Sequence, residues 1–106
     1  MDHHFDHENL DVYRLALEVA RWCRRARLGP THLRSQLTRA ADSVVLNVAE
    51  GRARGGDAGR NHYRVALGSA AEACAALDLT TSSDAAVQQA KLRRVGAMLR
   101  RLSTAG

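Results

Sequence analysis

The stretch SVVLNVAEGRARGGDAGRNHYRVALGSAAEA, residues 43–73, decides the fold of this chain. Apolar residues recur at helical spacing on both sides of GRARGGD, residues 51–57, which breaks the pattern with glycine and arginine. This arrangement predicts two helices joined by a short link, with Gly51 as the C-cap of the first and Asp57 as the N-cap of the second. We expect these two helices to pack antiparallel.

The segments on either side carry the same periodicity. An apolar stripe beginning at Val12 predicts a helix over residues 9–28, which Gly29 and Pro30 end. Further helices are predicted over residues 31–50, 57–79 and 85–102. No strand pattern is evident, so the sequence predicts an all-α, antiparallel up-down four-helix bundle. Residues 9–103 form its single domain, and residues 1–8 are expected to be disordered or frayed.

Composition narrows the class of protein. Of the 106 residues, 45% are hydrophobic but only 4% are aromatic, so we expect a core of Ala, Leu and Val. No apolar run is long enough to predict a membrane span, and the acidic, His-rich start does not resemble a signal peptide. Cys23 and Cys74 lie far apart without a CxxC pair, which favours free thiols in a reducing compartment; a disulfide in a secreted scaffold is the alternative. We therefore expect a cytoplasmic protein without membrane contact.

The positive charge is concentrated in the second half of the chain. Residues 1–50 hold seven arginines and seven acidic residues, whereas residues 51–106 hold nine Lys and Arg against four acidic residues, for a net charge of +5. Such cations favour phosphate contacts, so the sequence predicts sequence-independent binding of RNA or DNA. A merely solvated surface is the alternative. The predicted binding residues are Arg52, Arg54, Arg60, Arg64, Lys91, Arg93, Arg94, Arg100 and Arg101.

A polar stripe runs beside the apolar stripe of the second helix. Its members, spaced by three or four residues, are Gln36, Arg39, Ser43, Asn47 and Glu50, and the third helix offers Ser69 and Glu72 on a matching flank. The helical rise places Arg39 and Glu72 about 17 and about 20 Å from the link, which predicts a partly buried ion pair. We interpret the stripe as a structural polar seam that fixes register. His62 is interpreted as an isolated residue near a helix start.

A catalytic acid/base set is the alternative interpretation of the seam. It would need a cleft together with a nucleophile or a metal, and the sequence indicates neither. We therefore expect no catalytic residues, no metal site, no cofactor and no enzymatic activity.

The first helix carries a second apolar edge, formed by Leu10, Tyr13 and Leu17. One bundle core cannot easily absorb this edge together with the stripe beginning at Val12. It therefore predicts an oligomer interface.

Three motifs resemble a known family. Leu10, Val12, Tyr13 and Ala16 match an L-x-V-Y-x-x-A opening, residues 36–51 match Q-x-x-R-A-x-x-S-x-x-x-N-x-A-E-G, and residues 68–72 match G-S-x-x-E. The chain thus resembles the four-helix-bundle proteins encoded by intervening sequences in bacterial 23S rRNA genes. The resemblance covers about three quarters of the chain.

That resemblance implies a bundle that assembles as a ring-like homopentamer, without established enzymatic activity. A related branch comprises the accessory proteins of diversity-generating retroelements, which bind nucleic acid and a reverse transcriptase. A second functional hypothesis is therefore a protein-interaction scaffold or adaptor, such as a reverse-transcriptase accessory subunit.

Overall fold

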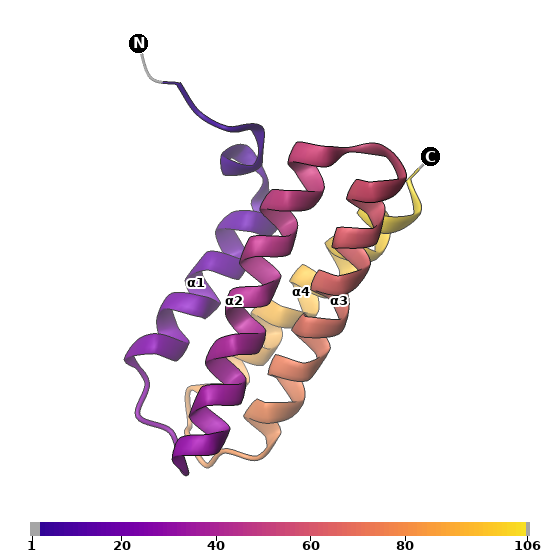
Figure 1. Ribbon diagram of the computed structural model, residues 1–106. Coiled ribbons are helices and arrows are strands. Elements are labelled where there is room, and N and C mark those ends of the chain that lie inside the picture. The colour runs from indigo at the N-terminus through magenta and orange to yellow at the C-terminus, as the bar shows by residue number, and fades with distance from the viewer. Residues whose placement is uncertain (1–2, 106) are drawn as a thin grey trace.

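The computed structural model describes residues 3–105 and is built from four long helices (Figure 1). A short 3₁₀ helix precedes them, and the elements in order are η1 (Asp6–Asn9), α1 (Asp11–Arg25), α2 (Thr31–Arg54), α3 (Gly56–Asp78) and α4 (Ala85–Thr104). Each helix contacts the next and α1 also contacts α4, whereas no Cα atoms of diagonal helices lie within 8 Å of each other; the described residues form no strand. The predicted antiparallel up-down four-helix bundle is confirmed.

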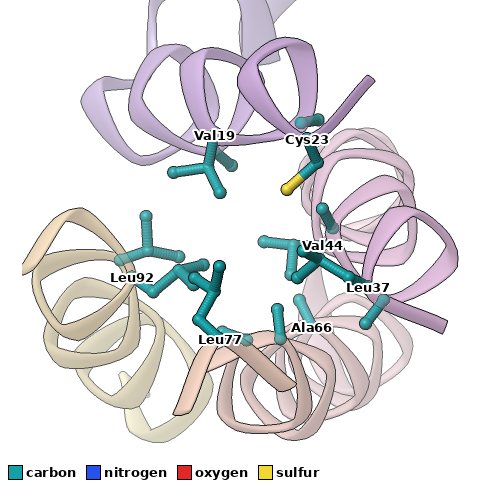
Figure 2. Close-up of a cluster of buried hydrophobic side chains, with 14 of the residues drawn as sticks. Val19, Cys23, Leu37, Val44, Ala66, Leu77 and Leu92 are labelled. Atoms are coloured by element: carbon teal, nitrogen blue, oxygen red, sulfur yellow. The ribbon is translucent and has the colours of Figure 1, made fainter. Parts of the chain in front are cut away.

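The core is built from small and aliphatic side chains of all four helices. Figure 2 shows Val19 of α1, Val44 of α2, Leu77 of α3 and Leu92 of α4 pointing into the space that the helices enclose. On the side of α3 the core is lined by alanines, which let its neighbours approach closely: Ala66, Ala70, Ala73 and Ala76. Tyr63 is the only buried aromatic side chain among residues 3–105.

The turn between α2 and α3 differs from the expected one. The α2 helix continues past Glu50 to Arg54, and Gly55, with φ of 66°, caps the end of α2 and the start of α3. Gly51 therefore does not cap the helix but lies buried inside it, and the prediction of its role was wrong. A Cβ atom on Gly51 would lie 2.7 Å from Cε1 of Tyr63, and one on Gly59 would lie 2.5 Å from the Gly51 carbonyl oxygen. Gly51 is thus required by the close crossing of two helices.

The remaining boundaries shift by a few residues. The α1 helix ends at Arg25 rather than near residue 28, because Ala26 is extended and the link carries Leu28 back into the core, where it is 5% exposed. Asp57 lies in the first turn of α3 instead of capping it. The η1 helix overlaps the end of the segment expected to be frayed, residues 1–8, whereas residues 1, 2 and 106 fall outside the described residues. Within residues 3–105, none of the helices has the length and apolarity needed to cross a membrane.

Candidate nucleic-acid interface

The centre of the predicted polar seam joins α2 to α3. The hydroxyl oxygens of Ser43 and Ser69 lie 2.8 Å apart, and Asn47 Nδ2 donates to the Ser43 carbonyl at 2.9 Å and to its hydroxyl at 3.1 Å. His62 Nδ1 lies 2.9 Å from Asn47 Oδ1. Because that amide oxygen can only accept, the His62 proton is on Nδ1. Four half-buried side chains thus form one continuous hydrogen-bonded network between the two helices.

His62 is the member of this network that sequence reasoning missed. Its signal was available in the spacing from the turn at Gly55: Asn47 lies eight residues before that glycine and His62 seven residues after it. Nearly equal spacing from a tight turn brings residues of antiparallel helices level with each other. An apolar-stripe analysis does not reveal this, because it treats each helix alone.

The outer members of the seam do not pair across the helices. Gln36, Arg39, Glu50 and Glu72 are all exposed, so the predicted partly buried pair of Arg39 and Glu72 was wrong. Each step of four residues rotates about 40° around a helix, so Arg39 points about 80° away from Asn47. Glu50 pairs instead with Arg54 on its own helix at 2.7 Å, and this guanidinium lowers the pKa of the Glu50 carboxyl.

Two predicted binding residues anchor the end of α4. Arg60 donates to the carbonyl of Ala105 at 3.2 Å, and Arg64 donates to the carbonyl of Ser103 at 3.3 Å. Cations at a helix C-terminus also favour the helix dipole. Arg60 pairs in addition with Asp57, whose carboxyl pKa it lowers. These two arginines therefore have a structural role whatever they bind.

One end of the bundle is rich in arginine. The α2–α3 turn and the C-terminal end of α4 lie at the same end of the molecule (Figure 1). Six of the nine predicted binding residues belong to the helix turns at this end: Arg52, Arg54, Arg60, Arg64, Arg100 and Arg101.

The cations of α4 do not form the single outer cluster that their spacing suggests. Arg93 and Arg100 border a groove between α3 and α4 whose floor is made of small residues, including Ala70, Cys74 and Gly96. Lys91 lies on another side, in a groove between α1 and α4. Arg101 borders a third hollow beside Leu10, while Arg94 is exposed. The predicted residues thus distribute over several faces of the bundle.

Sequence reasoning also missed a cationic groove between α1 and α4. Arg14, Arg21 and Arg25 of α1 line it opposite Lys91 of α4, and its only carboxylate is that of Glu18, 3.7 Å from Lys91 Nζ. Trp22 and Gln88 complete its polar and aromatic lining. The spacing of the arginines, seven and then four residues, indicates one helix face. The net charge of residues 1–50 did not reveal these arginines, because the seven acidic residues of that half balance its seven arginines.

A second overlooked groove lies between α1 and α2. Arg24, Arg34 and Arg39 line it together with Thr31, Ser35 and Thr38, and Asp42 accepts a 2.7 Å hydrogen bond from Arg24. Arg39, expected in the seam facing α3, therefore belongs to the side of α2 that borders α1.

Most cations have no acidic partner. Of the 16 Lys and Arg residues, Arg24, Arg54, Arg60 and Lys91 pair with carboxylates. The other twelve have no carboxylate within 4.0 Å among residues 3–105. Their positive charge is therefore available to an external anion.

The predicted interface edge of α1 is half-buried. Leu10 and Tyr13 pack against the edge of the core, and the His7 ring meets the Tyr13 ring edge-on at 4.6 Å. Leu17 borders a hollow between α1 and α2 beside Leu46, which is 67% exposed. The edge is thus partly covered by its own chain and continues onto α2. Its role as an interface stays a prediction.

The two cysteines differ in environment. Cys23 is buried, and this burial raises the pKa of its thiol to about 11, whereas Cys74 is half-buried; both are free. Within the described part of the chain, no group of three His, Cys, Asp or Glu residues could hold a metal ion.

Together these features define a class: a small up-down helical bundle with an alanine-rich core, a polar seam between its second and third helices and a cationic surface. The comparison with known families agrees with this class. The chain belongs to the family described as 23S rRNA-intervening sequence protein, whose family model matches residues 8–104. A search of curated proteins gives no match.

Proposed function

We propose that the protein binds RNA or DNA through the phosphate backbone, with little sequence preference and without catalysing a reaction. The observation that supports this most is the excess of unpaired cations: twelve guanidinium groups, spread over several faces, have no carboxylate within 4.0 Å among residues 3–105. A polyanion that wraps or crosses such a surface releases counterions at each phosphate contact. The family description, which refers to an intervening sequence of 23S rRNA, is compatible with a nucleic-acid partner.

The proposal includes self-assembly of this chain into a homopentamer, the assembly that its resemblance to the family implies. Its support here is the apolar edge of Leu10, Tyr13 and Leu17, extended by the exposed Leu46. A ring of subunits would multiply weak phosphate contacts, so a single groove need not bind tightly. Two free cysteines suit the reducing environment of a cytoplasm.

A second candidate is a protein scaffold, for instance an accessory subunit of a reverse transcriptase. The exposed apolar side chains favour it, because Leu46 and Leu79 are 67% and 73% exposed. Such exposed side chains would bury apolar surface against a protein partner. The two candidates differ in their response to salt, since apolar contacts do not release counterions.

A salt titration tests the nucleic-acid proposal. The affinity for one duplex and one structured RNA is measured for the wild type and for a variant with Arg93, Arg94, Arg100 and Arg101 all changed to Gln. On duplex DNA, the slope of log affinity against log salt should fall by about 0.9 for each phosphate that the variant no longer neutralises. All four arginines are exposed, so the fold should persist.

The matched control is Glu72→Gln, an exposed change that should leave the slope intact. Absence of wild-type binding at about 50 mM salt, or an unchanged slope in the quadruple variant, would favour the scaffold candidate.

A further inference from the structure

The side of the bundle where α1 meets α4 carries a band of positive charge. The cationic groove between these helices lies on this side, and the hollow that Arg101 borders lies further along the same two helices. The two linings together hold five cations against the carboxylates of Asp11 and Glu18, a net charge of +3. We call these five cations the α1–α4 band: Arg14, Arg21, Arg25, Lys91 and Arg101.

The band extends along the bundle axis. Because α1 and α4 are antiparallel neighbours, Arg101 lies level with the first turn of α1, and Lys91 lies level with Glu18, 3.7 Å from its carboxylate. The helical rise separates Arg14 from Arg25 by about 16 Å. The cations thus follow the line along which the two helices meet.

Little within the chain neutralises this band. Of its five cations, Lys91 pairs with Glu18. The four arginines have no carboxylate within 4.0 Å among residues 3–105. Arg14 Nε donates to the carbonyl of Glu8 at 3.3 Å, a contact that orients the guanidinium and leaves its charge unpaired.

The other sides of the bundle attract a polyanion less. The groove between α1 and α2 has three arginines, and Asp42 accepts a 2.7 Å hydrogen bond from one of them, Arg24. The groove between α3 and α4 has Arg93 and Arg100 against Asp78. The centre of the α2–α3 seam consists of hydroxyl, amide and imidazole groups that bond to one another. Phosphates should therefore gather on the α1–α4 side.

We propose that the α1–α4 side binds one unpaired strand of RNA or DNA, which runs along the bundle axis with its phosphates against the α1–α4 band. A single narrow band suits one backbone, whereas a duplex presents two backbones that wind around its axis. The cations of α1 follow one another at uneven intervals of seven and then four residues, to which a flexible strand can adjust.

The aromatic lining of the groove agrees with this assignment. Trp22 is half-buried there among the cations. A cationic groove with an aromatic side chain is the usual composition of a single-strand site, because the cations follow the backbone and the ring meets a base. The inference rests on the proposed nucleic-acid binding and deepens it, because it names one side of the bundle and one form of nucleic acid.

Two double variants test the assignment to this side. Arg21→Gln with Arg25→Gln removes two charges from the band, and Arg34→Gln with Arg39→Gln removes two from the groove between α1 and α2. All four arginines are exposed, and none forms an ion pair or side-chain hydrogen bond with another of residues 3–105, so both variants should fold.

The affinity of each variant is measured over a range of salt concentrations with a strand of about twelve thymine nucleotides, a length typical of single-strand sites. In the Arg21 and Arg25 variant, the slope of log affinity against log salt should fall by about 1.4, because each phosphate contact with a single strand contributes about 0.7. In the Arg34 and Arg39 variant it should fall by much less. Equal decreases in the two variants would overturn the assignment to the α1–α4 side.

Trp22 reports whether the strand lies in the groove, because it is the single tryptophan of the chain. Its fluorescence should change over the same concentrations at which the strand binds. The Arg21 and Arg25 variant should shift this change to higher concentrations. Binding of the strand without any change in Trp22 fluorescence would overturn the site.

The same thymine strand, annealed to an adenine strand, separates the two forms of nucleic acid. At one salt concentration, the Arg21 and Arg25 variant should lose more affinity for the single strand than for the duplex. Equal losses would overturn the single-strand assignment and leave the proposed function standing. If the wild type binds neither form at about 50 mM salt, the proposed function fails and this inference fails with it.

Discussion

The crossing of α2 and α3 at Gly51 and Gly59 predicts opposite outcomes for three glycine-to-alanine changes. Ordinarily, alanine in a helix interior is about 0.8–1.0 kcal/mol more stable than glycine. At Gly51, however, the new Cβ would lie 2.7 and 2.9 Å from the Tyr63 ring. At Gly59 it would lie 2.5 Å from a backbone oxygen, which cannot move unless the helices separate.

Overpacking of this kind costs about 1–3 kcal/mol, and the larger value applies where backbone is the obstacle. After subtracting the gain in helix propensity, we expect Gly51→Ala to destabilise by about 1 kcal/mol and Gly59→Ala by about 2 kcal/mol. Gly68 is the matched control, because it lies in α3 with nothing within 4 Å of its added Cβ. Gly68→Ala should stabilise by about 0.5–1 kcal/mol.

Thermal unfolding followed by circular dichroism measures these differences, at one fixed protein concentration because association shifts the midpoint. For a chain of this size, each kcal/mol moves the melting temperature by about 4 °C. Gly68→Ala should therefore melt above the wild type and Gly59→Ala well below it. If Gly51→Ala and Gly59→Ala melt as high as Gly68→Ala, the helices do not cross closely at these glycines, and the packing argument is refuted.

Three further predictions concern the seam, a thiol and assembly. Asn47→Ala removes the only partner of the His62 Nδ1 proton found in residues 3–105, so it should lower the free energy of unfolding by about 1–3 kcal/mol in urea titrations. Glu72→Ala, at an exposed position, should change the free energy of unfolding by less than about 0.5 kcal/mol. Burial raises the pKa of the Cys23 thiol from 9.0 to about 11, so the folded state holds the thiol proton more tightly than the unfolded state. The melting temperature should therefore fall as the pH rises from 9.0 to about 11. In Cys23→Ala the contribution of this thiol to that fall should be absent. Leu17→Glu should dissociate the proposed oligomer, and sedimentation of the wild type as an 11.5 kDa monomer at micromolar concentration would contradict assembly.

The bundle itself could be predicted from sequence because each helix carries an unambiguous apolar stripe. Val12, Val44, Ala66 and Leu92 belong to those stripes and are buried as the spacing requires. The ends of the helices were harder to predict from the sequence. Gly51 matched the usual pattern of a C-cap, and only the neighbouring helix reveals that the glycine is needed for close packing.

The polar surfaces could be predicted only in part, because their partners lie on other helices. Ser43, Asn47 and Ser69 do meet, yet the stripe rotates and carries Arg39 to the side of α2 that borders α1. No sequence pattern indicated that the Gln88 side chain would be buried without a hydrogen-bond partner for its Oε1 atom among residues 3–105. Its isolation depends on how α1 packs against α4, which no spacing rule within α4 describes.

Three residues of the family motif contribute to the packing of α2 against α3. Its serine, asparagine and glycine, Ser43, Asn47 and Gly51, all lie where α2 meets α3, and each is used by an interaction within the chain. The proposed nucleic-acid binding therefore relies on the surfaces outside this seam, where most cations have no acidic partner among residues 3–105.

The same reasoning decides which variants can report on binding. Arg60 and Arg64 hold the C-terminal carbonyls of α4, so their replacement would alter the fold and the surface charge together. Arg93 and Arg94 are exposed, and neither takes part in an ion pair or side-chain hydrogen bond with another of residues 3–105. A decrease in affinity after replacing them can be attributed to the ligand, because removing their charge leaves the hydrogen bonds and ion pairs of the bundle in place.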